Sequence, residues 1–138
     1  MNKNQNVELI KRFYHEMWNQ FDKSIFPELL TKDFRFRGSL GKYTTGYKCF
    51  REYVDFIQNA FPDFHNHIEE IISEGNKSFA RLTYKGTHHG ELFGIKPTNK
   101  LIEYSGAAVF HFKNERISEV WVLGDIYGLV QQLKDDKG

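Results

Sequence analysis

The sequence predicts a single α+β domain in which N-terminal helices pack on a curved antiparallel or mixed β-sheet. Apolar residues recur at spacings of three and four up to about residue 61, which is typical of amphipathic helices. From about residue 65 they alternate, which is typical of strands. A length of 138 residues suits one domain with one core, spanning 1–138 with a core of about 7–133.

Three helices are expected before the sheet. The second runs over about 24–30 with Ser24 as its N-cap and with Pro27 in its first turn. The third ends where Pro62 and Asp63 stop it. The first has an aromatic buried stripe made of Val7, Ile10, Tyr14, Met17, Trp18 and Phe21.

Strand-like segments follow the helices near 65–74, 78–89 and 101–124. A two-residue turn at Asn114 and Glu115 would fold the last of them into a hairpin. A short helix is expected at the end, from Asp125 to Leu133.

Side chains of a strand alternate between its two faces, so the second segment has a defined inner set. His88 stands at the end of that set, whereas His89 faces outward. The inner set consists of Ala80, Leu82, Tyr84, Gly86 and His88.

In the hairpin, the two-residue turn would pair Phe112 with Ile117. Alternation from that pair puts Trp121 and Asp125 on the inner face together with Phe110. Because an apolar outer face is unusual in a stable monomer, we expect a second copy of the chain to cover it and form a homodimer. That outer face lies around Val109, Val120 and Val122.

Composition excludes several classes of partner. The formal net charge is +1 and no run of lysine or arginine occurs, so neither nucleic acid nor a membrane is an expected partner. The lone Cys49 excludes an intrachain disulfide, and no secretory leader opens the sequence, so we expect a cytoplasmic protein. His65 and His67 share a face, but no third ligand can be placed beside them, so no metal is expected.

Five sequence features together resemble the SnoaL-like polyketide cyclases of the nuclear transport factor 2-like superfamily. They are Phe61-Pro62-Asp63, Gly86-Thr87-His88-His89-Gly90, Pro97-Thr98-Asn99-Lys100, Trp121 with Asp125 four residues later, and the tail Gly128-Leu129-Val130-Gln131-Gln132-Leu133. The resemblance implies a cone-shaped α+β barrel (cystatin-like), in which the sheet wraps around the helices and leaves an apolar cavity. It also implies that Asp125 is the acid/base residue and that His88 is the histidine of the family motif.

Chemistry of this kind needs a base, a proton return and a dry cavity, but no cofactor. The expected reaction is an intramolecular aldol cyclisation or isomerisation of a small apolar carbonyl compound. Asp125 would move the proton, and His88 would stabilise the enolate, with help from a tyrosine. The residues expected to contact the substrate are Tyr14, Trp18, Phe50, Tyr84, Tyr104, Phe110 and Trp121.

Each candidate residue also has a structural interpretation. Asp125 follows Gly124 and precedes an apolar helix, so it is equally placed to be an N-cap. His88 could be a hydrogen-bonded histidine at a strand end. The alternative function is therefore a non-catalytic domain that binds a small ligand or dimerises.

Overall fold

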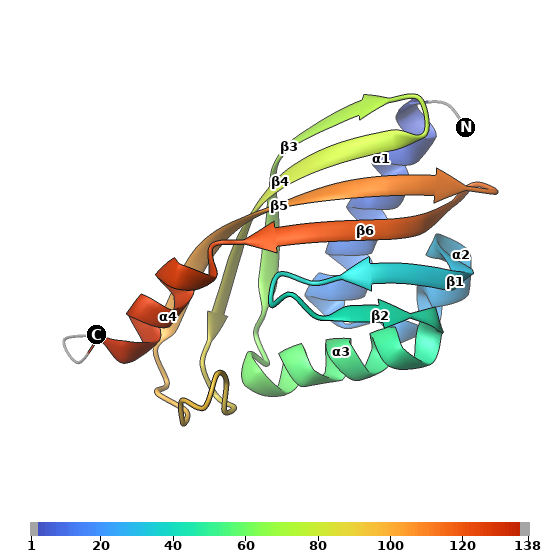
Figure 1. Cartoon of the computed structure of the whole chain (residues 1–138). Coiled ribbons are helices and arrows are strands. Elements are labelled where there is room, and N and C mark those ends of the chain that lie inside the picture. The colour runs from blue at the N-terminus through green and yellow to red at the C-terminus, as the bar shows by residue number, and fades with distance from the viewer. Residues whose placement is uncertain (1–2, 136–138) are drawn as a thin grey trace.

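The computed structural model describes residues 3–135 and consists of helices packed on a six-stranded sheet (Figure 1). The helices are α1 (Lys3–Arg12), the π-helical η1 (Phe13–Trp18), the 3-10 helix η2 (Lys23–Ile25), α2 (Phe26–Leu29), α3 (Gly46–Ala60) and α4 (Ile126–Lys134). The strands are β1 (Leu30–Arg37), β2 (Tyr43–Thr45), β3 (His65–Glu74), β4 (Lys77–Thr87), β5 (Leu101–Lys113) and β6 (Arg116–Gly124). No helix within 3–135 is long and apolar enough to span a membrane.

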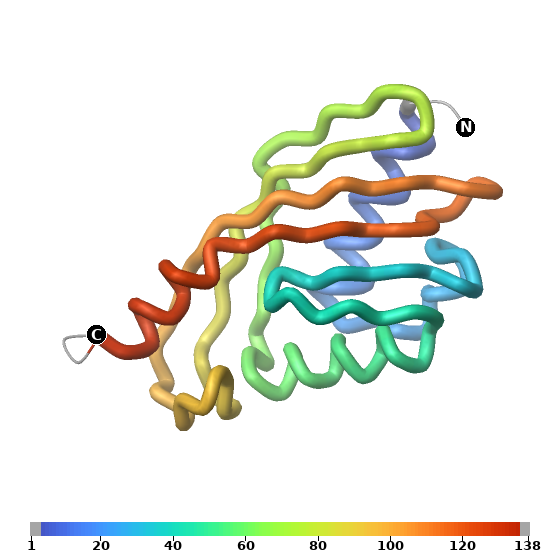
Figure 2. The backbone as a smooth tube through the Cα atoms, in the orientation of Figure 1, coloured from blue at the N-terminus to red at the C-terminus, as the bar shows by residue number. Residues whose placement is uncertain are grey.

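The sheet is mixed and curved, as the sequence predicted. Its strand order is β2-β1-β6-β5-β4-β3, with β1 parallel to β6 and all other neighbours antiparallel. Figure 1 shows α1 crossing behind the strands and α3 running along the edge formed by β1 and β2. Figure 2 shows β4 and β5 curving away as they extend beyond β6. The sheet therefore wraps partly around the helices without closing.

We expected helices and no strands before residue 65. Strands β1 and β2 lie in this region, so that expectation is wrong. The sequence over 34–37 reads Phe-Arg-Phe-Arg, and Phe34 and Phe36 are buried while Arg35 is exposed. Alternation over so few residues is a weak signal beside the helical patterns on either side. The segment becomes a strand because β6, distant in sequence, pairs with it.

The second helix begins earlier than expected. Asp22, not Ser24, caps it: the Asp22 carboxylate accepts a hydrogen bond from the Ser24 backbone N–H at 3.1 Å. The helical segment ends at Leu29, and Leu30, expected inside the helix, is the first residue of β1. The predicted N-cap at Ser24 is therefore wrong by two residues, although Pro27 does lie in the first turn of α2.

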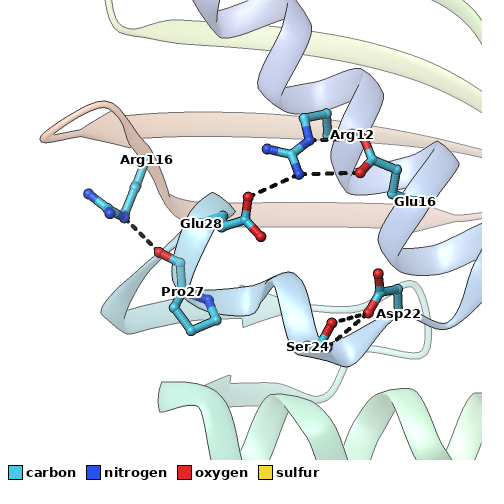
Figure 3. Close-up of polar contacts among 7 residues, drawn as sticks. All are labelled: Arg12, Glu16, Asp22, Ser24, Pro27, Glu28 and Arg116. Carbon is cyan, nitrogen blue, oxygen red and sulfur yellow. Dashed lines mark hydrogen bonds and ion pairs between the residues drawn. The ribbon is translucent and has the colours of Figure 1, made fainter.

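Polar contacts attach α2 to its neighbours (Figure 3). Arg12 pairs with Glu16 at 2.9 Å and with Glu28 of α2 at 3.4 Å. On the other side, Arg116 Nε donates a hydrogen bond to the Pro27 carbonyl oxygen at 2.8 Å. These side chains are partly exposed, so each ion pair contributes at most about 1 kcal/mol, and burial of apolar side chains remains the larger stabilising effect.

The predicted hairpin turn is confirmed. Asn114 and Glu115 have φ angles of 53° and 60°, which is the left-handed backbone of a tight two-residue turn. Lys113 pairs with Arg116, and Phe112 pairs with Ile117 as expected.

A β-bulge directly after that pair reverses the faces of β6. The next residues in register are His111 and Glu119, so β6 carries one extra residue. Val120 and Val122, expected on the outer face, are 0% and 4% exposed on the side that the helices cover. Trp121, expected on the inner face, is 38% exposed on the outer face. The predicted faces of these residues are wrong because a one-residue shift moves every later side chain to the other side.

Candidate functional site

A narrow cavity lies between the N-terminal helices, α3 and the inner face of the sheet. Its volume is about 30 Å³, which is room for one or two water molecules. None of the residues that line it has a side chain charged at neutral pH. They are Phe13, Tyr14, Trp18, Phe36, Ser39, Tyr53, Ile57, Phe64, Asn66, Tyr84 and Val122.

Buried tyrosines are the main polar groups of this cavity. Tyr14, Tyr53 and Tyr84 line it, and Tyr104 lies beside Tyr84 with ring centroids 4.8 Å apart. All four are at most 4% exposed. Burial raises the pKa of each phenol, to about 12 for Tyr104. The hydroxyls therefore stay protonated at neutral pH and act as uncharged hydrogen-bond donors.

The four hydroxyls differ in their partners. The Tyr104 hydroxyl lies 3.1 Å from Ser39 Oγ in a hydrogen bond. The Tyr53 hydroxyl contacts the Ser39 side chain and the Leu40 backbone, which lower its pKa against the larger opposite effect of burial. Within 3–135, no hydrogen bond engages the hydroxyls of Tyr14 and Tyr84. These two donors are free for a ligand or water in the cavity.

Two glycines let the backbone lie directly against the tyrosines. A Cβ atom at Gly106 would collide with the Tyr84 ring, and one at Gly38 would collide with the Tyr53 hydroxyl. Because any side chain at these positions would displace a phenol, the glycines fix where the hydroxyls stand.

Asn66 adds an amide to the cavity wall. Its backbone N–H and its Nδ2 both donate to Asn19 Oδ1, at 2.7 and 3.0 Å, and its carbonyl accepts from Asn19 Nδ2 at 3.0 Å. These bonds join the end of the first helix to β3. Asn66 Oδ1 takes no part in these three bonds.

Asp125 is the N-cap of α4. Its Oδ1 accepts a hydrogen bond from the Gly128 backbone N–H at 2.9 Å, and its side chain is exposed and outside the cavity lining. The expected inner position of Asp125 beside Trp121 is wrong because of the bulge in β6. Gly124, the residue before it, does contact the cavity rim, since a Cβ there would lie 2.7 Å from Ser39 Cβ. The acid/base role of Asp125 stays a prediction.

His88 lies on the inner side of the sheet at the end of β4, as predicted, and is fully buried. Its Nδ1 accepts a hydrogen bond from the Thr98 backbone N–H at 3.2 Å, which places the ring proton on Nε2. Burial lowers the pKa of the imidazole, and this effect is larger than the opposite effect of the Gly90 backbone. Within 3–135, Nε2 has no hydrogen-bond partner of ordinary geometry. His88 is outside the cavity lining and holds the segment 88–100 to the sheet.

The structure brings together three of the predicted contact residues, Tyr14, Trp18 and Tyr84. Phe50 and Phe110 are fully buried in the core outside the cavity lining, and Tyr104 contacts the lining residues Ser39 and Tyr84. Trp121 lies on the outer face, where the Arg37 guanidinium stacks over its ring at 4.9 Å.

Sequence reasoning missed eight lining residues. Asn66 had a usable signal, because it lies between two outward histidines and so must face inward. Phe36 and Ser39 required the recognition of β1. The eight are Phe13, Phe36, Ser39, Tyr53, Ile57, Phe64, Asn66 and Val122.

The family model of SnoaL-like polyketide cyclases matches residues 8–133. The chain belongs to this family. The resemblance carried by the sequence motifs is therefore confirmed, and with it the nuclear transport factor 2-like fold of helices on a curved sheet.

Solved structures agree with this SnoaL-like fold. A Jannaschia sp. CCS1 protein assigned as a SnoaL-like polyketide cyclase is 19% identical and superposes with a TM-score of 0.86, covering 94% of this chain and 92% of its own. TsrD from Streptomyces laurentii is also 19% identical with a TM-score of 0.86, at coverages of 97% and 98%. AclR from Streptomyces galilaeus, assigned as a hydroxylase, is 20% identical with a TM-score of 0.82, at coverages of 96% and 86%. No curated protein matches the chain.

The cap at Asp125 can be separated from an acid/base role by two substitutions. Asp125→Asn keeps an acceptor for the Gly128 N–H, so we expect the free energy of unfolding to stay close to wild type. Asp125→Ala removes the acceptor and should lower it by about 1 kcal/mol. Urea denaturation measures both. An alanine variant as stable as wild type would contradict the cap, whereas loss of turnover in the stable asparagine variant would support the acid/base role.

Buried, neutral His88 predicts that stability falls on acidification. Because its pKa is lowered in the folded state, the unfolded chain binds the extra proton, and stability is lost as the pH drops below about 6.5 toward the folded pKa. The slope is at most about 1.4 kcal/mol per pH unit. We expect His88→Gln to flatten this dependence in urea denaturation between pH 7.5 and 5.5, and exposed His65→Gln to leave it unchanged. Equal slopes in wild type and His88→Gln would contradict the prediction.

Proposed function

We propose that this SnoaL-like protein binds a small, uncharged, apolar carbonyl compound in the cone cavity and promotes its intramolecular aldol cyclisation or isomerisation without a cofactor. The observation that supports this most directly is the pair of free phenol donors, Tyr14 and Tyr84, in an aromatic cavity. Such donors bind carbonyl oxygen, and the surrounding rings bind the apolar body of the compound.

The neutral lining favours an uncharged ligand. An ion that enters this cavity would lose its hydration and find no side chain of opposite charge, at a cost of several kcal/mol. A carbonyl group loses little free energy on entering the cavity when it accepts a hydrogen bond from Tyr14 or Tyr84. Carboxylates, phosphates and amines are therefore poor ligands.

The same donors can accelerate enolisation. As a carbonyl compound becomes an enolate, negative charge grows on its oxygen, and the hydrogen bonds from Tyr14 and Tyr84 strengthen. No carboxylate or imidazole lines the cavity within 3–135. The site therefore suits a carbon flanked by two carbonyls, whose proton leaves to a weak base. Asp125, which is exposed and outside the lining, stays the candidate base from the sequence.

The second candidate is a non-catalytic binding domain. The neutral lining favours it too, since the two catalytic candidates from the sequence, Asp125 and His88, are engaged in a helix cap and in a loop contact. Turnover separates the two functions, because both predict binding of the same class of compound.

We expect the β-dicarbonyl benzoylacetone to bind and its charged analogue benzoylacetate not to bind. Tyr84→Phe removes one donor and should weaken benzoylacetone binding about fivefold. Tyr127→Phe, at an exposed position outside the cavity lining, is the matched control and should leave binding unchanged. Isothermal titration calorimetry measures the affinities.

Deuterium exchange at the carbon between the two carbonyls, followed by NMR, then distinguishes the functions. Faster exchange with the wild-type protein, reduced in Tyr84→Phe, supports an enzyme. Binding without faster exchange supports the binding domain. Equal affinity for benzoylacetate, or unchanged affinity in Tyr84→Phe, would contradict the proposed site.

The homodimer predicted from the sequence is proposed here on a corrected surface. Val120 and Val122 are inside, so the apolar outer face is now defined by Val109, Trp121 and Leu123, which are between 37% and 55% exposed. Val109 and Trp121 are direct cross-strand neighbours, so the apolar surface is continuous between β5 and β6.

We expect a dimer mass in light scattering at micromolar concentration. Leu123→Glu places a charge in the apolar outer face and should give a monomer. Phe56→Glu, at an exposed position on α3, is the control and should remain dimeric. A monomer mass for the wild-type chain would contradict this association.

A further inference from the structure

The loop over residues 38–42, which joins β1 to β2, forms part of the cavity wall. It is a compact turn, because the Gly38 N–H donates to the Lys42 carbonyl at 3.0 Å and the Gly41 N–H donates to the Gly38 carbonyl at 2.9 Å. Leu40 packs against the core. These internal bonds hold the loop in one compact shape.

The loop places one hydroxyl among the phenols. Ser39 Oγ hydrogen-bonds the Tyr104 hydroxyl at 3.1 Å and also contacts the Tyr53 hydroxyl. On its other side Ser39 packs against Gly124, where no Cβ intervenes. A single serine oxygen thus occupies the position between two phenols where a ligand oxygen would receive two hydrogen bonds.

We propose that Ser39 Oγ occupies the place of a second carbonyl oxygen of the ligand, and that loop 38–42 swings outward so that this oxygen can bind between Tyr53 and Tyr104 while the first binds Tyr14 or Tyr84. The identity of the ligand rests on the proposed function, whereas the movement of the loop does not.

The cavity of about 30 Å³ admits only water, so part of its wall must move before a larger ligand can enter. Most of the wall belongs to helices and strands. Phe64, which is in a loop, is held by ring contacts of 5.7 to 5.9 Å with Tyr84, Trp18 and Phe61. Loop 38–42 is held by the Ser39 hydroxyl, by the contact of the Leu40 backbone with Tyr53 and by the Leu40 side chain. It belongs to no helix or strand, so we take it as the part of the wall that moves.

Opening this loop also creates the site that the ligand fills. When Ser39 leaves, the hydroxyls of Tyr53 and Tyr104 each lose a hydrogen-bond partner, and a buried polar group without a partner is costly. A neutral ligand oxygen restores the lost bonds. Entry of the ligand and displacement of Ser39 are therefore coupled, and a compound without such an oxygen gains nothing from opening the loop.

Access of acrylamide to Trp18 tests the loop without any ligand. The chain has two tryptophans, so a Trp121→Phe background leaves Trp18, which lines the cavity, as the one fluorophore of this type. In that background, Ser39→Ala removes the hydrogen bond to Tyr104, and Gly124→Ala pushes Ser39 away. Each should raise the acrylamide quenching constant about twofold to fivefold. Ser105→Ala, exposed on the outer face of β5 next to Tyr104, is the matched control and should not change it.

Stopped-flow binding of benzoylacetone tests the place of the oxygen. Ser39→Ala should raise the association rate about fivefold and leave the dissociation rate within about twofold of the background, because the ligand replaces the serine hydroxyl in the complex. A purely structural serine would instead lower stability without changing the association rate. An unchanged association rate, or a dissociation rate changed by as much as the association rate, overturns the assignment of the oxygen site.

Acrylamide quenching and benzoylacetone binding test different parts of the proposal. If quenching rises in either loop variant but benzoylacetone does not bind, the loop movement stands and the proposed ligand class is wrong. If neither Ser39→Ala nor Gly124→Ala changes quenching while near-UV circular dichroism shows both variants folded, the loop proposal is overturned whatever benzoylacetone does.

Discussion

Phe50 is the residue on which the rest of the fold depends. It is fully buried on α3, and its ring contacts three other parts of the chain. Ring centroids lie 4.7 and 5.0 Å away at Phe36 and Phe34 of β1, 5.2 Å away at Phe26 of α2, and 6.0 Å away at Trp18 of the first helix. Packing of this kind stabilises by both apolar burial and favourable ring geometry. The helices and the first strand are thereby held in one core, into which the rest of the sheet curves.

This aromatic core also determines the nature of the cavity. Large rings fill most of the space inside the cone, so the remaining cavity is small and its wall is uncharged. In these surroundings burial keeps the phenols of Tyr14 and Tyr84 protonated, which suits them to donate to an oxygen and not to accept a proton. The charged and titratable candidates are placed elsewhere: Asp125 stabilises the start of α4, and His88 stabilises a loop. Binding and fold stability thus use different polar residues.

Local patterns predicted most of the secondary structure because each depends on neighbours in sequence. The strand predicted over 65–74 coincides with β3, the turn at Asn114 and Glu115 is present, and the third helix ends before Pro62 as expected. Alternation along β4 correctly placed Tyr84 and His88 on the inner side. The family motifs, which also lie in short segments, correctly indicated the SnoaL-like family.

The sequence by itself thus determined the family, the kind of fold, and the aromatic and tyrosine-rich character of the interior. Only the tertiary structure decided which residues meet in the cavity. One extra residue in β6 exchanged the faces of Trp121 and Val122, because a strand has a period of two and no local pattern reports a bulge formed by pairing. The contact of Ser39 with Tyr104 joins residues 65 positions apart and exists only because β1 folds back beside β6. Long-range strand pairing, which the sequence does not encode locally, is the physical reason for both differences.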